Sequence, residues 1–276
     1  AVDLHIQAFR LAEELSCPVM VCMDGYILTH AYESVDLPTQ EQVDAYVPAF
    51  EPVQVLDPQD PVSIGAMVGP EAYAEVRYLA HHKHVRALEA IPRLSQAFQD
   101  IFQRPSGGLL DPYETEGAET ILLALGSVNG TIKDAVDDLR KEGWPVGSVA
   151  LRSFRPFPSH VLRHVVQDAK RIIVIEKDLA MGKGGIVSSD VKMALRGLPI
   201  IVDTVIAGLG GRPIPKTSVI DTVKRACLEG LEEPHFLDLN WEAINRELTR
   251  QQEQRRSGPT PENLLREMGV PGAKPV

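Results

Sequence analysis

Four short apolar runs alternate with helical segments in the middle of the chain, and this alternation constrains the fold more than any other feature. The runs are residues 119–125 (ETILLAL), 146–151 (VGSVAL), 171–176 (RIIVIE) and 200–206 (IIVDTVI). Between these runs, and after the last one, apolar residues recur at the spacing of an amphipathic helix. Strands separated by helices need crossover connections, so the sequence predicts an α/β domain with a doubly wound, mostly parallel sheet over residues 111–233.

The segment before this domain has a different pattern. Residues 3–15 place apolar side chains at helical spacing. Residues 18–23 (PVMVCM) form a continuous apolar run, which predicts a buried strand that ends at Asp24-Gly25. One helix and one strand are too small to fold alone. We therefore expect residues 1–35 to be the end of another domain.

Residues 36–110 are predicted to form a linker followed by helices. Six prolines in the first half of this segment fix φ and remove backbone donors, so we expect an ordered, extended stretch that wraps over a surface. Helical spacing returns over residues 71–104, where Pro92 should kink or split the helix. The polar tail, residues 234–276, is expected to hold a charged helix over residues 240–256 and otherwise to lie against a partner or to be loose.

Charge and cysteine content exclude several classes of protein. The formal net charge of −10 disfavours nucleic acid and anionic membranes as partners. The sequence has no apolar run of about 20 residues and no signal-peptide pattern, so we expect a cytoplasmic protein. Because it lacks an initiator Met, we expect it to start inside a longer product. The three cysteines, Cys17, Cys22 and Cys227, cannot ligate an iron–sulfur cluster and are expected to be buried.

Three glycine-containing segments follow predicted strands, where parallel sheets bind their ligands. They are residues 126–130 (GSVNG), 181–185 (MGKGG) and 208–213 (GLGGRP). Ser127 or Asn129 in the first segment, and Lys183 in the second, could help to bind a phosphate, but neither segment has Rossmann or Walker spacing. We favour structural turns for both, with Asn129 or Thr131 as a helix N-cap. In the third segment Arg212 could pair with a carboxylate of a neighbouring subunit, and we favour a structural or interface role.

A carboxylate and an imidazole lie where the first apolar run ends. Asp24, Tyr26 and His30 could be catalytic, although such a set is more often a hydrogen-bonded interface network. Residues 81–84 (HHKH) lack the spacing of a helical zinc pair, and we expect a solvated face there. Residues 152–158 (RSFRPFP) predict a packed turn that fixes the following helix.

Sequence signatures of the common catalytic sites do not occur. The sequence contains no Ser-His-Asp elbow, no P-loop, no zinc signature and no G-D-G…N motif for the magnesium of thiamine diphosphate enzymes. We therefore assign no catalytic residue and no metal ligand. On the residues alone, the chain is an α/β domain joined to a fragment of another domain, and we infer that it belongs to an assembly.

Several long segments resemble the alpha subunit of pyruvate:ferredoxin oxidoreductases. They are PVMVCMDGYILTHAYE (18–33), GPEAYAEVRYLAHHK (69–83), LALGSVNGTIKDAVDDLRKEG (123–143), SFRPFP (153–158) and VIAGLGGRPIPK (205–216). The resemblance covers most of residues 1–260. It implies that residues 111–233 are similar to the carboxyl-terminal domain of transketolase. It also implies that residues 1–35 end a pyrimidine-binding domain.

The resemblance implies a reaction in which pyruvate, coenzyme A and oxidised ferredoxin give acetyl-CoA, carbon dioxide and reduced ferredoxin. Thiamine diphosphate, Mg²⁺ and 4Fe-4S clusters would be bound in the complex and not by this chain alone. The partners would be beta, gamma and delta subunits, or fused equivalents, with ferredoxin reached through the complex. The family's cofactor-activating glutamate lies in a stretch without a counterpart here, so no catalytic residue is carried over.

Two alternatives to this interpretation stay open. One is a subunit of a related enzyme for 2-oxoglutarate or a branched-chain 2-oxoacid, because these enzymes share the architecture. The other is a stand-alone module that binds a nucleotide or coenzyme A through the loops around Gly126 and Gly182. In the preferred interpretation the chain is mainly structural, serves assembly and is inactive by itself.

Overall fold

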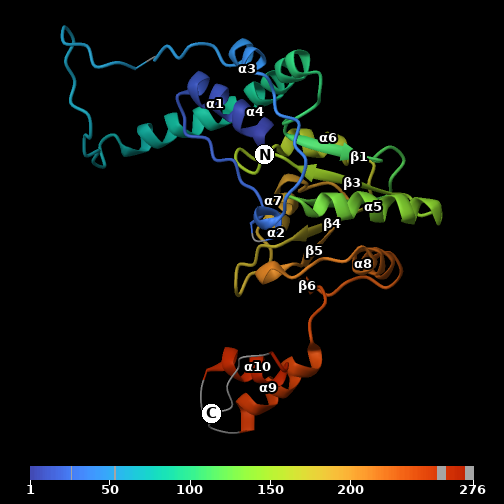
Figure 1. Ribbon diagram of the computed structural model, residues 1–276. Coiled ribbons are helices and arrows are strands. Elements are labelled where there is room, and N and C mark those ends of the chain that lie inside the picture. The colour runs from blue at the N-terminus through green and yellow to red at the C-terminus, as the bar shows by residue number, and fades with distance from the viewer. Residues whose placement is uncertain (26, 53, 254–258, 271–276) are drawn as a thin grey trace. The chain divides into compact units, whose positions relative to one another are not determined.

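The computed structural model describes residues 1–25, 27–52, 54–253 and 259–270. The chain divides into two compact units, Ala1–His235 and Phe236–Val276 (Figure 1). The first unit contains a group of amino-terminal helices and five full strands of a sheet with its helices, and the described part of the second unit contains two helices.

The sheet has the predicted parallel core. Its strands are β1 (Leu110–Tyr113), β2 (Thr120–Ala124), β3 (Val146–Leu151), β4 (Arg171–Glu176), β5 (Ile201–Ile206) and β6 (His235–Phe236), in the order β1-β3-β2-β4-β5-β6. Strand β2 pairs in parallel with β3 and β4, and β4 pairs in parallel with β5, whereas β1 pairs antiparallel with β3. The four predicted strands are confirmed, and the two short edge strands were not predicted.

Helices cover both faces of this sheet. They are α5 (Val128–Lys141), α6 (Ser159–Val165), α7 (Val187–Ala194) and α8 (Lys216–Leu228), with the short 3₁₀ helix η1 (Leu209–Gly211) before α8. Helices α5 and α8 contact each other on one face, and α6 and α7 contact each other on the opposite face (Figure 1). The predicted doubly wound, mostly parallel α/β fold is therefore confirmed.

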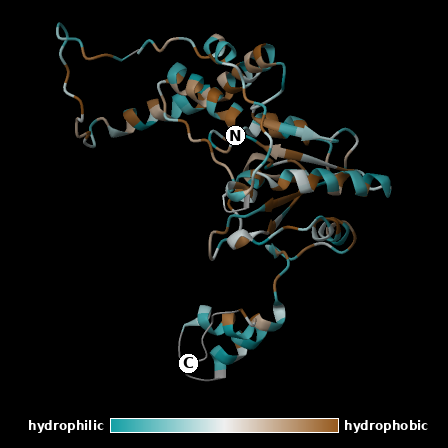
Figure 2. Ribbon diagram, viewed as in Figure 1, coloured by the Kyte–Doolittle hydropathy of each residue, from teal (hydrophilic) through white to brown (hydrophobic). Residues whose placement is uncertain are grey.

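Side chains that alternate along the strands form an apolar core on each face of the sheet. On one face Leu123, Val149 and Val174 pack with Leu162 of α6 and Val191 of α7. All residues of β2 and β3 are buried, which explains why these strands appear in the sequence as continuous apolar runs. Figure 2 shows the same contrast between apolar strands and helices that are polar on their outer side.

The amino-terminal part of the first unit is helical. It contains α1 (Val2–Leu15), α2 (Ile27–His30), α3 (Gln40–Tyr46) and α4 (Tyr73–Phe102). The helices predicted over residues 3–15 and 71–104 are confirmed, and α4 continues through Pro92, so the proline does not split it.

The strand predicted over residues 18–23 is wrong, because this segment forms neither a helix nor a strand. Met20 is 86% exposed and Met23 is 53% exposed. A strand needs a neighbour for its backbone donors and acceptors, and the described residues provide none at this segment. An apolar run alone does not identify a strand.

Helix α3 was not predicted, although the sequence carries a signal for it. Thr39 and Gln42 form a capping box: the Gln42 amide donates to Thr39 Oγ1 at 3.3 Å, and the Thr39 amide donates to Gln42 Oε1 at 3.0 Å. This T-x-x-Q pattern before a short amphipathic segment is a known helix start.

An aromatic cluster joins α3 to α4. Tyr46, Phe98 and Phe102 are buried, with ring centroids 5.4 Å apart between Tyr46 and Phe98 and 4.0 Å apart between Phe98 and Phe102. The Tyr46 hydroxyl donates to the Leu94 carbonyl at 2.9 Å. Burial raises the pKa of Tyr46 to about 12, so the hydroxyl keeps its proton and remains a donor.

The linker between α3 and α4 does not lie against the rest of the described chain. Every described residue from 48 to 68 is exposed. Within the described chain the segment therefore covers no surface, since prolines fix its extended backbone but do not supply a covering partner, and a surface outside this chain stays a prediction.

The described part of the second unit contains a pair of packed helices, α9 (Trp241–Glu253) and α10 (Thr260–Glu267). Arg250 pairs with Glu267 at 2.5 Å. The charged helix predicted over residues 240–256 is confirmed for residues 241–253, whereas Asn240 precedes the helix and residues 254–256 lie outside the described residues. Of the helices that the structure describes, none combines the length and the apolar character that crossing a bilayer requires.

The α3–α4 cluster gives a stability prediction. We expect Phe98→Ala to lower the free energy of unfolding by about 3–5 kcal/mol, because the ring is fully buried and its removal leaves a cavity. Phe9→Ala is the matched control, since Phe9 is 64% exposed on α1. Equilibrium urea unfolding followed by circular dichroism measures both variants, and equal losses for the two would contradict the assignment of this core.

Candidate functional site

The order of the strands marks one position at the edge of the sheet. From β2 the chain passes to β3 on one side, and from β3 it crosses to β4 on the other side of β2. In doubly wound sheets ligands bind at this switch point, outside the carboxyl ends of the two central strands. Gly126 and Ser127 follow β2 there, and Lys177 follows β4.

A side chain of the same chain binds at this position. The carboxylate of Asp24, from the segment between α1 and α2, accepts the Ser127 amide proton at 2.6 Å and a proton of Lys177 Nζ at 3.1 Å. A Cβ on Gly126 would lie 2.7 Å from Asp24 Oδ2, and Gly126 has a φ of +76°. Glycine is therefore required here by both its conformation and the close approach of the carboxylate.

The surroundings keep Asp24 ionised. Partial burial acts to raise the pKa of its carboxyl, but the hydrogen bonds from Ser127 and the hydrogen bond and charge of Lys177 outweigh burial, so the pKa lies below its ordinary value. The Ser127 amide belongs to the residue that caps α5, where the helix dipole also favours a negative charge. Asp24 thus supplies the anion at this helix terminus.

A second carboxylate occupies the neighbouring helix terminus. Glu176, the last residue of β4, accepts the amide protons of Ile186 at 2.8 Å, Val187 at 2.7 Å and Ser188 at 3.1 Å. Its side chain is buried. A Cβ on Gly185 would lie 1.9 Å from Glu176 Oε1, so the glycine makes room for this cap.

The two loops considered for phosphate binding are therefore closed by the chain itself. Asp24 fills the position at the start of α5, and Glu176 fills the position at the start of α7. A diphosphate at either position would displace a carboxylate and place like charges together. The residues of these loops do not fit a diphosphate as they stand, and no reaction step is assigned to them.

The predicted residues of the first loop have structural roles. Asn129 lies in the first turn of α5 and donates through Nδ2 to the carbonyls of Gly126 at 2.9 Å and Ala124 at 3.3 Å. The prediction of Asn129 or Thr131 as N-cap is wrong, because Ser127 is the capping residue and the capping carboxylate comes from Asp24. Asp24 and Ser127 are 103 residues apart, so no local sequence pattern reveals their contact.

The hydrogen bonds given above for Asp24 are made with Ser127 and Lys177, and the remaining candidates lie in other segments. Lys183 is exposed and lies in a turn, where its backbone amide donates to the Ala180 carbonyl at 2.9 Å. Arg212 is exposed after η1, and His30 is exposed with Nδ1 lying 3.4 Å from Thr29 Oγ1. Tyr26 lies outside the described residues.

Two further sequence predictions can be compared with the structure. The turn at residues 152–158 packs Phe154 and Phe157 against the core, as expected, and Arg155 pairs with Asp190 of α7 at 2.9 Å. The expectation of buried cysteines is wrong for Cys22 and Cys227, which are exposed. Cys22 and Cys227 lie outside the packed faces of their segments. The apolar residues around them did not reveal this exposure.

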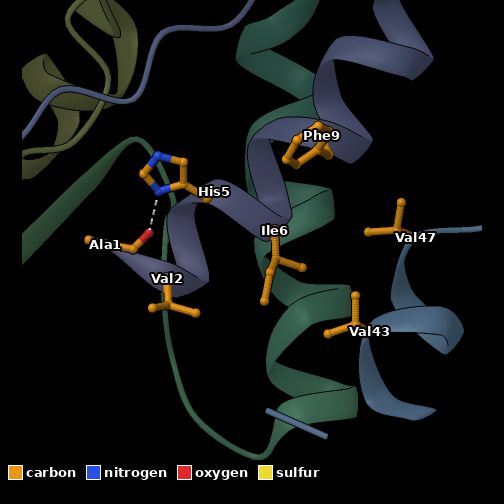
Figure 3. A pocket seen from close by; sticks show the side chains of 7 residues that line it. All are labelled: Ala1, Val2, His5, Ile6, Phe9, Val43 and Val47. Atoms are coloured by element: carbon orange, nitrogen blue, oxygen red, sulfur yellow. Dashed lines mark hydrogen bonds between the residues drawn. The ribbon is translucent and has the colours of Figure 1, made fainter. Parts of the chain in front are cut away.

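An apolar pocket lies away from the edge of the sheet. It is lined from α1, α3 and their neighbouring residues by Ala1, Val2, His5, Ile6, Phe9, Val43 and Val47 (Figure 3). Its one titratable side chain is His5, whose Nδ1 lies 2.9 Å from the Ala1 carbonyl oxygen. Across the described part of the chain, no group of three or more His, Cys, Asp or Glu side chains is placed to hold a metal ion. The pocket therefore presents no catalytic set.

Two family models match the chain in series. Residues 1–95 match the thiamine diphosphate-binding part of pyruvate flavodoxin/ferredoxin oxidoreductases, and residues 118–219 match pyruvate:ferredoxin oxidoreductase core domain II.

Curated relatives match most of the chain. Pyruvate synthase subunit PorA of Methanosarcina barkeri is 38% identical over 88% of this chain and 63% of the relative. Ketoisovalerate oxidoreductase subunit VorA of Pyrococcus horikoshii is 35% identical over 76% of this chain and 54% of the relative. The chain thus spans about three-fifths of the length of the curated relatives it matches.

A solved structure, the 2-oxoglutarate:ferredoxin oxidoreductase from Magnetococcus marinus, overlaps 68% of this chain and 29% of its own, at 15% identity and a TM-score of 0.41. That degree of likeness carries no argument about function.

The fold and the site define a doubly wound α/β chain whose sheet edge is closed by its own carboxylates. By its family matches and relatives, the chain belongs to the pyruvate:ferredoxin oxidoreductase family, as a counterpart of the alpha subunits. The resemblance found in the sequence is confirmed. Asp24 lies in the first matched region, and Ser127 and Lys177 lie in the second, so this contact joins the two.

The Asp24 contact predicts a pH-dependent contribution to stability. We expect Asp24→Ala to lower the free energy of unfolding at pH 7 by about 1–2 kcal/mol. Most of this loss should come from the Ser127 hydrogen bond, because the ion pair with the half-exposed Lys177 is screened by solvent. Because the pKa of Asp24 in the folded chain is below its unfolded value of about 3.9, this contribution is complete above about pH 5. It is lost as the pH falls through the folded pKa.

Urea unfolding at pH 7 and near pH 3 measures this effect, and the gap between wild type and variant should shrink at the lower pH. Asp168→Ala is the control, because Asp168 is exposed and makes no hydrogen bond within the described residues. A loss of equal size for both variants, or one that is independent of pH, would refute the role given to Asp24.

Proposed function

We propose that this chain is the alpha-subunit portion of a pyruvate:ferredoxin oxidoreductase. The reaction of the whole enzyme would be the oxidative decarboxylation of pyruvate with coenzyme A, giving acetyl-CoA and carbon dioxide while ferredoxin is reduced. The observation that carries this proposal is the similarity to pyruvate synthase subunits PorA, at 38% identity over 255 residues for the Methanosarcina barkeri protein.

Within that enzyme the chain would act mainly as a scaffold. The Asp24 contact supports this role, because it fastens the segment after α1 to the carboxyl edge of the sheet. Holding a cofactor-binding region in a fixed orientation can contribute several kcal/mol to catalysis without any direct chemical role. We assign no catalytic residue to the chain. The limits 1–35, 36–110, 111–233 and 234–276 remain our proposal for its domains.

The cofactors and partners follow from the family. Thiamine diphosphate, Mg²⁺ and 4Fe-4S clusters would be held in the assembled complex, by groups outside the loops that Asp24 and Glu176 close. Beta, gamma and delta subunits, or fused equivalents, would be the partners, with ferredoxin as electron acceptor and the cytoplasm as location. The interface role proposed for Arg212 fits its exposed place after η1.

A related substrate is the alternative with a specific observation behind it. Ketoisovalerate oxidoreductase subunits VorA from two Pyrococcus species are 35% and 34% identical to this chain. A branched-chain 2-oxoacid therefore stays a candidate, and 2-oxoglutarate is a further one by architecture. A stand-alone nucleotide or coenzyme A module is disfavoured, because both glycine loops already hold carboxylates.

Substrate-dependent ferredoxin reduction by the assembled enzyme tests the proposal. The complex that contains this chain should reduce ferredoxin with pyruvate and coenzyme A at least about tenfold faster, in kcat/KM, than with 2-oxoisovalerate or 2-oxoglutarate. Such a ratio corresponds to the roughly 1–3 kcal/mol that a pocket gains from fitting a side chain. A preference for 2-oxoisovalerate would instead assign the chain to the VorA group. If the complex reduced no ferredoxin with any of the three 2-oxoacids, the proposed family function would be overturned.

A further inference from the structure

One apolar row runs along most of α4. Its residues recur at intervals of three and four, the heptad spacing that keeps side chains on one side of a helix. We call this row the seam, and its apolar members are Tyr73, Val76, Ala80, Ala87, Ala90 and Leu94. Lys83 occupies the remaining position of the row.

Helix α1 covers the seam only in the second half of this row. Ala87 and Ala90 are buried and pack with Leu15, near the end of α1. The cover ends where α1 ends, because Lys83 Nζ donates at 3.3 Å to the carbonyl of Ser16, the residue that caps α1. Figure 1 shows the first half of α4 extending beyond α1.

Before Lys83 the seam is open within the described part of the chain. Tyr73 is 56% exposed and Val76 is 44% exposed, whereas Ala80 is half-buried. A packed apolar row that continues without a cover is typical of a surface that another element covers. The open part spans about three helical turns, or about 16 Å, which is enough for one short helix to pack against it.

Cationic side chains flank this row. In a heptad, the positions on either side of the seam pair with charges of the partner helix. Arg77 and Arg86 occupy such positions, and both are exposed and make no hydrogen bond or ion pair within the described residues. Residues 73–86 hold three Lys and Arg residues, three histidines and one acidic residue, although the formal net charge of the chain is −10.

We propose that the open seam of α4 binds an amphipathic helix of a non-identical partner chain. That helix would carry apolar side chains at heptad spacing and Asp or Glu at the flanking positions, because opposite charges beside an apolar seam select the partner. Pairing with the α4 of a second copy is disfavoured, since it would bring the arginines of both copies together.

This inference rests on the proposed function in one respect. The partner subunits of the assembled enzyme would supply the acidic helix, and the inference adds the surface of this chain that receives it. A different 2-oxoacid substrate would leave it unchanged.

Photo-crosslinking in the assembled enzyme identifies the occupant of the seam. One variant carries Val76→p-benzoylphenylalanine, and a matched control carries the same residue at His82, which is exposed on the side of α4 opposite Ala80. Illumination should link position 76 to a partner subunit at least about tenfold more efficiently than position 82. The linked peptide should have apolar residues at heptad spacing with Asp or Glu beside them.

Charge reversal tests the pairing of the flanking residues. Arg77→Glu and Arg86→Glu should each weaken binding of the full chain to the linked subunit by about threefold to tenfold, because like charges then meet. Arg196→Glu, the same change at an exposed residue after α7, should bind as the wild type does. Replacing the facing acidic residue of the subunit with Lys should restore the affinity of the Glu variants. Circular dichroism verifies that each variant is folded.

Several results would overturn the proposal. Position 76 could link to a second copy, to no subunit, or to a peptide without acidic flanks, or both arginine variants could bind with wild-type affinity. Ferredoxin reduction with the 2-oxoacids, measured on the same preparations, separates this inference from the proposed function. An active complex without the predicted cross-link would refute the inference alone, whereas a cross-linked complex that reduces no ferredoxin would refute the function alone.

Discussion

Carboxylates bound to helix termini are the constraint on which the rest of this structure depends. Glu176 accepts three backbone amides at the start of α7, and Asp24 accepts the Ser127 amide at the start of α5 together with Lys177. In a doubly wound sheet these are the places where an anionic ligand usually binds. Here they are used for internal fastening, and Gly126 and Gly185 leave the space that the carboxylates need.

This contact joins two differently built parts of the first unit. The segment after α1 has no strand to pair with, and its apolar side chains are largely exposed. Its firm attachment to the sheet is the ionised Asp24, whose pKa is held down by Ser127 and Lys177 against the opposing effect of burial. The contact holds the segment after α1 against the carboxyl edge of the sheet, where it occupies the helix terminus that a free anion would need.

Much of the fold could be predicted from the sequence, because β2 and β3 are wholly buried, β4 and β5 are buried except at their starts, and their apolar runs are separated by helical periods. The edge strands β1 and β6 are short and only partly buried, so they left no such signal. The apolar run at residues 18–23 was misleading, since burial depends on partners that a local pattern does not contain. The capping box of α3 was visible in the sequence and was overlooked.

The candidate site was only half predictable. Asp24 and Ser127 were found because both follow apolar runs, at places where strands were predicted to end. Lys177 and Glu176 were missed, because their roles arise from contacts between segments that are far apart or from a side chain that turns back onto a helix terminus. Asn129 was chosen for its capping propensity, but the anion at that helix came from 103 residues away along the chain.

Amide hydrogen exchange at the two helix termini tests this account most directly. At neutral pH the account predicts that Asp24→Ala speeds exchange of the Ser127 amide by about tenfold or more, and that Glu176→Gln does the same for Ile186, Val187 and Ser188. The amide of Ile132, inside α5, should stay as protected as before in both variants. Unchanged exchange at Ser127 and at residues 186–188 would contradict the claim that these carboxylates close the edge of the sheet.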